Sequence, residues 1–204
     1  MVQHAQFIAG IANAFGETEN TIKLVHRTLR EAGYLHGLQG RHAPERTAED
    51  AAVFLCWLGT TDKPSLGPVA VEDFGKSRRS GHLGNSERET LQRLGLPEEH
   101  SLLEMLAALV RTSANREDLG GYVIDFRPDE LHVRVNGFLG TFGYSREHET
   151  AVAEYNARHA KPYRVTRTLP KSLIDSVAAI FAGDAHVEAC PASANAKKRR
   201  ALAG

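Results

Sequence analysis

The chain has 204 residues, of which 42% are hydrophobic and 25% are charged, values that are ordinary for a folded globular protein. Lysine and arginine together number 25, as do aspartate and glutamate, so the formal net charge is zero. A global excess of positive charge is therefore excluded as the basis of nucleic-acid binding, and any such site has to come from local clustering.

The cysteines and the apolar runs indicate the cellular compartment in which the protein is expected. Cys56 and Cys190 lie too far apart for a disulfide framework or a zinc knuckle, and Cys56 lies in an apolar run typical of a core. The longest apolar runs, AAVFLCWLG and LLEMLAALV, are too short to span a bilayer. The first residues lack the basic region and apolar stretch of a signal peptide. We therefore expect a cytoplasmic protein with no membrane association.

The N-terminal third predicts three helices. Apolar residues at helical spacing indicate a helix over about 4–15, interrupted by Gly16. Thr18 is placed to cap a second helix that ends at Gly33. The apolar stripe of this helix consists of Ile22, Val25, Leu29 and Ala32. A glycine-rich basic loop follows, and a third helix is expected from Thr47 to Gly59.

The middle of the chain changes in composition. Residues 60–86 are rich in glycine, proline, serine and charge, which is typical of a linker, with Val69, Val71 and Phe74 as the residues that would structure its middle. A short amphipathic helix is expected at 87–94 and a longer one at 101–116. The apolar side of the longer helix is expected to face its own core.

Alternation with period two then predicts a β-hairpin from 122–126 and 131–135, and a third strand at 138–145. Beyond it we expect a helix at 146–160 and a strand at 163–168. A last helix begins after Pro170 and ends at Gly183. From Asp184 the chain has little to bury and ends in Lys197–Arg200, which predicts a disordered basic tail.

The first two helices carry a specific register around Gly16. A small residue, Ala12, lies four positions before the glycine, where two helices would cross closely. Branched apolar residues, Ile22 and Val25, lie six and nine positions after it. The segment IANAFGETENTIKLVHRTLREAGYL therefore resembles the helix-turn-helix of bacterial and phage regulators, although Glu17 stands where an apolar residue is usual. TIKLVHRTLREAGYL also resembles the recognition helix of winged-helix proteins, with GLQGRHAP as the wing or as an ordered loop.

This resemblance covers roughly residues 4–58, and it implies double-stranded DNA as a partner. The residues that it places toward the major groove are Thr18, Glu19, Asn20, Thr21, Lys23 and Arg27. The residues that it implies for flanking phosphates are Arg30, Arg41, His42 and Arg46. Between Asn20 and Arg46 there are five lysines and arginines against two acidic residues, a modest local excess.

Other chemistry is not indicated. The ten histidines are scattered without the spacing of a zinc motif, which favours surface or capping roles, and no metal or cofactor is expected. Asp125, Asp129, Glu130 and His132 surround the predicted hairpin turn, and a solvated turn explains them better than a nuclease site. We therefore expect no enzyme activity.

Together these features predict an α+β protein. Residues 1–59 would form a three-helix DNA-binding domain, 60–86 a linker, 87–183 a unit of small antiparallel sheet and helices for oligomerisation or partner binding, and 184–204 the tail. The expected function is a sequence-specific transcriptional regulator of prophage or mobile-element type, acting as a homodimer or higher homo-oligomer. Two alternatives remain open: a ring-forming small terminase-like packaging subunit, and a protein-interaction module without a DNA function.

Overall fold

The computed structural model describes residues 2–35, 45–127, 132–137, 140–145 and 166–182. They form helices and one antiparallel sheet, so the predicted α+β class is confirmed. The helical segments are α1 (His4–Phe15), α2 (Glu19–Glu31), α3 (Ala48–Thr60), the short turns η1 (Pro64–Leu66), α4 (Gly67–Ala70) and η2 (Val71–Gly75), then α5 (Asn85–Leu94), α6 (Leu102–Ala114) and α8 (Lys171–Ala182). The strands are β1 (Arg78–Ser80), β2 (Tyr122–Arg127), β3 (His132–Gly137), β4 (Gly140–Ser145) and β5 (Arg167–Pro170).

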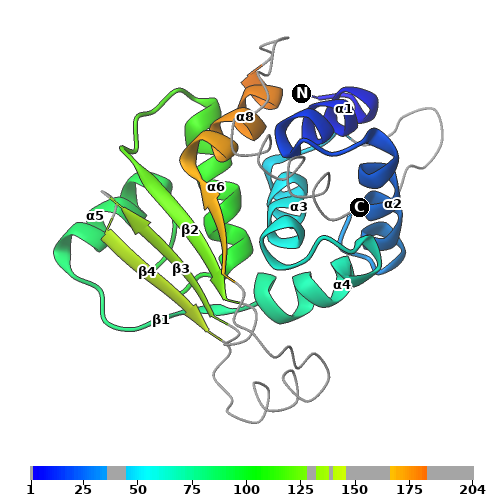
Figure 1. Ribbon diagram of the computed structural model, residues 1–204. Helices are drawn as coiled ribbons and strands as arrows, with labels where there is room; N and C mark the ends of the chain where they lie inside the picture. Colours follow the sequence, from blue (N-terminus) through cyan, green and yellow to red (C-terminus); the bar gives the residue numbers. More distant parts are fainter. Residues whose placement is uncertain (1, 36–44, 128–131, 138–139, 146–165, 183–204) are drawn as a thin grey trace.

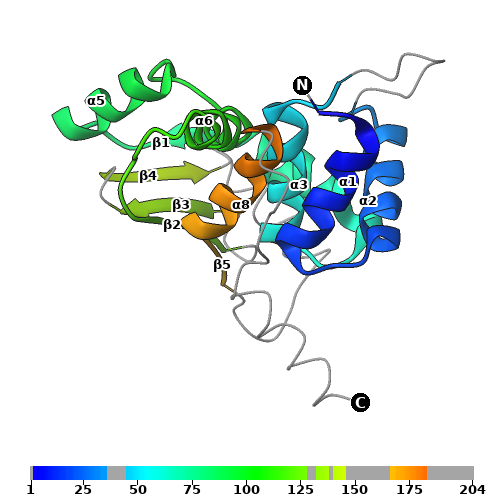
Figure 2. The same ribbon diagram turned by 90° about the horizontal axis from the view of Figure 1, so that it is seen from above.

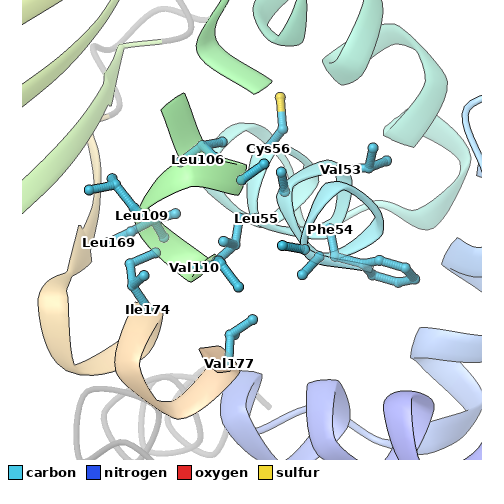
Figure 3. Packing of buried hydrophobic residues seen from close by; sticks show 14 of the residues in the cluster. Val53, Phe54, Leu55, Cys56, Leu106, Leu109, Val110, Leu169, Ile174 and Val177 are labelled. Atoms are coloured by element: carbon cyan, nitrogen blue, oxygen red, sulfur yellow. The ribbon is translucent and has the colours of Figure 1, made fainter. Parts of the chain in front are cut away.

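Helix α3 lies in the middle of the molecule (Figure 1). Nearly all of its residues are buried, because its sequence is apolar on every side, as a central helix requires. Figure 3 shows Leu55 on the side of α3 that faces Leu109 and Val110 of α6, and Phe54 pointing away from α6. There the ring of Phe54 meets Phe7 of α1, edge to face, with 5.6 Å between ring centroids. Helix α3 therefore joins the N-terminal helices to the part of the core that covers the sheet.

The sheet has the strand order β1-β4-β3-β2-β5, and every pair is antiparallel. The predicted hairpin is confirmed as β2 and β3, and the third strand as β4. The residues of the buried face alternate along the strands: Ile124, Phe126, Val133, Val135, Phe142, Tyr144 and Leu169. Helices α5 and α6 lie on one side of this sheet (Figure 2). The predicted strand at 163–168 appears as β5, which ends two residues later, and the predicted helix at 146–160 lies outside the described residues.

The stretch that composition indicates as a linker is folded over much of its length. Pro64 begins a run of helical turns through Gly75, and β1 then pairs with β4 at the edge of the sheet. Val71 and Phe74 are fully buried, and Phe74 contacts the ring of Phe126 at 6.4 Å between centroids. Val71 and Phe74 thus structure this stretch as expected, whereas Val69, the third residue expected to do so, is exposed.

The last described helix returns to the first. Helix α8 packs on both α1 and α6. The position that a Cβ atom on Gly10 would occupy is only 2.7 Å from the side chain of Ile180, and the rings of Phe7 and Phe181 are 6.1 Å apart. The described residues before 60 and after 86 thus share one hydrophobic core. The division of the chain into two functional units stays a prediction.

The contact between α3 and the sheet gives a stability prediction. A Cβ atom on Gly59 would lie 2.4 Å from the ring of Phe126, which is fully buried. We expect Gly59→Ala to lower the free energy of unfolding by about 1–3 kcal/mol through overpacking, even though alanine favours a helix. Urea unfolding of the full chain measures this change.

Gly121→Ala is the matched control, because no atom lies within 4 Å of the Cβ that it would add. It should change the free energy of unfolding by no more than about 0.5 kcal/mol. Equal stabilities for the two variants would contradict the close packing of α3 on β2.

Candidate nucleic-acid interface

Helices α1 and α2 form a tight hairpin around Gly16. The glycine closes α1 in the left-handed conformation, with φ 65° and ψ 27°. The amide of Gly16 donates to the carbonyl of Asn13 at 3.1 Å, and the amide of Glu17 donates to the carbonyl of Ala12 at 2.9 Å. A side chain here would strain the backbone, which explains the glycine. The predicted turn is confirmed.

Thr18 begins α2 as expected. Its hydroxyl accepts a hydrogen bond from the amide of Thr21 at 3.1 Å, which satisfies one of the free amides at the helix N-terminus. The hydroxyl groups of Thr18 and Thr21 also lie 3.0 Å apart. This cap sets the residue at which the helix begins, and it therefore sets which side chains face outward.

One side of α2 is buried against the body of the protein. Ile22, Val25 and Leu29 have no exposed surface, and Ala12 of α1 is buried as expected. His26 completes the buried side, with 5% of its surface exposed. The predicted helix phase is confirmed by these three apolar residues, whereas Ala32, the last residue of the predicted stripe, is exposed. His26 lies on the same stripe by its helical spacing.

The other side of α2 lies at the rim of the molecule, away from α5 and β4 (Figure 1). Thr18, Glu19, Asn20, Lys23 and Arg27 are exposed there. Thr21 and Arg30 flank them and are half-buried. We call this set of seven residues the outer face of α2. Leu24 lies among them with half of its surface exposed, an apolar residue that the sequence analysis did not single out.

The charges of the outer face are paired along the helix. Lys23 Nζ lies 2.9 Å from a carboxylate oxygen of Glu19, and Arg27 Nε lies 2.8 Å from one of Glu31. The hydrogen bond from Arg27 lowers the pKa of the Glu31 carboxyl. Exposed pairs of this kind are weak and salt-sensitive. Both cationic side chains can therefore exchange a carboxylate for another anion at little cost.

The remaining predicted site residues are Arg46, Arg41 and His42, and the structure describes only Arg46. Arg46 is almost fully buried, and its guanidinium lies 3.7 Å from the carboxylate of Asp50. Its backbone amide donates to the carbonyl of Val2 at 3.2 Å, which draws residue 46 back against the N-terminus. A phosphate contact by Arg46 is incompatible with this burial. Arg41 and His42 lie outside the described residues.

Two histidines meet that the sequence analysis treated as scattered. The ring of His4, at the start of α1, lies 4.6 Å from the ring of His26 between centroids. A third, His100, is fully buried, with its ring nitrogens 2.7 Å from the Pro97 carbonyl and 2.7 Å from the Tyr144 hydroxyl. The surface or capping role expected for the histidines is therefore wrong for His26 and His100. Spacing along the chain did not indicate the first pair, because its members come from different helices.

Two other polar groupings, around Asp125 and around Asp175, lie on the sheet and between α6 and α8. Asp125 accepts hydrogen bonds from Thr168 at 2.6 Å and from Asn136 at 3.3 Å, so its carboxylate ties three strands together. Asp129 and Glu130 lie outside the described residues. A cavity of about 300 Å³ between α6 and α8 contains Asp175, which accepts from Ser113 at 2.6 Å and from Lys171 at 2.8 Å. Both networks are explained by the contacts between elements that they stabilise.

Within the described ranges, no three histidine, cysteine, aspartate or glutamate side chains come close enough together to hold a metal ion. The same residues contain no helix with the length and apolar character needed to cross a membrane. Comparisons with family models, with curated proteins and with solved structures found no match to this chain.

The cap of α2 gives a second prediction. Thr18→Ala removes the hydrogen bond to the Thr21 amide and should lower the free energy of unfolding by about 1 kcal/mol. Thr18→Ser keeps the hydroxyl and should restore most of that loss. Thermal unfolding of both variants tests the cap, and equal destabilisation by serine and alanine would contradict it.

Proposed function

We propose that the chain binds double-stranded DNA through the outer face of α2, as a sequence-specific regulator. The observation that carries this proposal is the exposed row of hydroxyl, amide and cationic side chains on the second helix of a tight, capped hairpin. The opposite side of the same helix is anchored in the core. A rigid helix with one polar outer side has the shape that fits the major groove.

The side chains on the outer face suit both parts of a DNA contact. Asn20 can donate to and accept from the edge of an adenine, and Lys23 or Arg27 can donate to guanine. Thr18 and Thr21 lie at the helix N-terminus, where amides and hydroxyls favour a phosphate. Arg30 is half-buried beside them and adds a flanking positive charge.

The charge of this region indicates a modest electrostatic contribution. Of the five basic residues between Asn20 and Arg46, Arg46 is buried with Asp50 and does not take part. Lys23 and Arg27 would leave Glu19 and Glu31 in order to bind phosphates or bases. We therefore expect specific contacts to supply much of the affinity, with a shallow dependence on salt.

Leu24 supports a second candidate function, a protein-interaction surface on the same helix. It is half exposed at the centre of the outer face, between charges that are already paired. Under this alternative, Leu24→Ser should abolish binding of a protein partner or self-association, and the chain should have no affinity for DNA. Under the DNA proposal, Leu24 lies near the groove and its replacement weakens binding only partly.

Selection of bound duplexes from a random pool with the full chain, followed by affinity measurements on the selected site, tests the proposal. Arg27→Ala should weaken binding by about 1–3 kcal/mol, which corresponds to about fivefold to 150-fold, and should relax preference at one base position. Lys23→Ala should have a similar or smaller effect.

Arg88→Ala is the matched control for Arg27→Ala. Arg88 is also an exposed helical arginine with a glutamate partner, Glu98 at 3.3 Å, but it lies on α5 at the other end of the molecule (Figure 1). The affinity of the Arg88→Ala variant for DNA should lie within about twofold of that of the original chain. Equal losses for Arg27→Ala and Arg88→Ala would mean that binding is diffuse, and no selected sequence at all would refute the proposal.

Substitutions on the two sides of α2 should also differ in their effect on the stability of the protein. Val25→Asp places an unpaired charge in the core and should cost several kcal/mol, enough to prevent cooperative unfolding near the original temperature. Arg27→Ala, on the outer face, should unfold at nearly the original temperature. Circular dichroism measures both, and the reverse outcome would show that the orientation of α2 is wrong.

A further inference from the structure

The histidine pair, His4 and His26, lies inside the α1–α2 hairpin. Its rings are tilted by 55° with 4.6 Å between centroids. His4 Nδ1 and His26 Nε2 are both shielded from solvent, and neither has a hydrogen-bond partner among the described residues. Buried polar atoms without partners are uncommon in folded proteins and call for an explanation.

The charges that face the pair lie on α2, on α3 and on the segment that leads into α3, and most are positive. Lys23 and Arg30 lie on α2, and Arg46 follows on the segment that leads into α3. Asp50 of α3 is the acidic residue that faces His4. Its carboxylate already accepts from the amide of Thr47 at 3.2 Å and pairs with Arg46 at 3.7 Å. Little negative charge is left to balance a protonated imidazole.

A neutral imidazole tolerates this environment, whereas a protonated one does not. In neutral histidine one ring nitrogen is an acceptor, and a buried acceptor without a donor is a limited cost. Protonation turns that nitrogen into a donor that has no acceptor, and it adds a positive charge beside Arg46. Burial and then Arg46 lower the pKa of His26 to about 4, and the same two causes lower the pKa of His4.

A bound divalent metal is a poorer explanation of the two free nitrogens. Arg46 repels a cation at this position, and no third ligand accompanies the two imidazoles among the described residues. The cluster is therefore suited to remaining neutral and closed, and to opening when protons become available.

We propose that the His4–His26 pair is a pH-sensitive switch: while neutral it allows α1 and α2 to close on each other, and on acidification its protonation opens the hairpin. The consequence for DNA rests on the proposed function, since opening the hairpin removes the support of the outer face of α2. DNA is then released as the pH falls.

The size of the effect follows from proton linkage. His26 that is exposed by opening titrates near its ordinary pKa of 6.5, whereas in the closed hairpin its pKa is about 4. The open form therefore takes up the proton first. Between pH 7 and pH 5 this one residue shifts the closed–open equilibrium toward the open form by about 20-fold, and the shift stops growing below pH 4. Stability is thus full above pH 6.5 and is lost as the pH falls.

The experiment compares His26→Phe with His82→Phe in the full chain. Phenylalanine keeps a ring at position 26 but cannot be protonated, and His82 is an exposed histidine that follows β1. Unfolding equilibria are measured at pH 7 and pH 5. The unfolding constant of His82→Phe should rise over this interval by about 20-fold more than that of His26→Phe. His100 remains in both variants, so its own titration cancels in the comparison.

A ¹⁵N-histidine NMR titration of the unmodified chain provides the second measurement and does not require a variant that folds. His26 should remain neutral in the folded protein at pH 5.5. Protonation of folded His26 near pH 6.5, or the same pH dependence in both variants, would overturn the switch. Affinity for the selected DNA duplex at both pH values separates the two proposals, because a chain that shows the pH effect without binding DNA refutes only the DNA function.

Discussion

Burial of helix α3 on all of its sides is the constraint on which the rest of the structure depends. Its apolar run is packed by α6 on one side and by Phe7 of α1 on the other, and Gly59 fits against Phe126 of the sheet. The α1–α2 hairpin consequently packs on the same hydrophobic core as the sheet, and α8 packs against α1. Because α2 is held on this core, its outer side chains lose little conformational entropy when they bind a partner.

Helix α2 divides the remaining properties of the molecule between its two sides. The inner side holds Ile22, Val25 and Leu29 together with His26. The apolar residues that stabilise the hairpin and the histidine whose protonation would open it therefore lie on the same side of α2. The outer side carries Lys23 and Arg27 in weak pairs that a phosphate or base can replace. A protein that binds DNA with this helix would therefore couple its affinity to pH through the packing of the helix rather than through the contact surface.

Local patterns in the sequence predicted the parts of the fold that depend on local chemistry. The αL glycine at 16, the cap at Thr18 and the period-two strands β2 and β3 are of this kind, and all are observed. The parts that failed depend on contacts between distant segments. Arg46 was expected to contact a phosphate, yet its amide donates to the carbonyl of Val2 and its side chain is buried. The contact between His4 and His26 was not predicted either, because it forms only when α1 and α2 fold into the hairpin.

Hydrogen–deuterium exchange of the full chain, with and without its selected DNA duplex, is the most direct test of where DNA lies. If DNA occupies the outer face of α2, backbone amides from Gly16 to Glu31 should be protected, most strongly near the Thr18 cap, while β4 and α5 remain unchanged. Protection confined to the sheet or to α5, with α2 exchanging as in the free protein, would contradict the account.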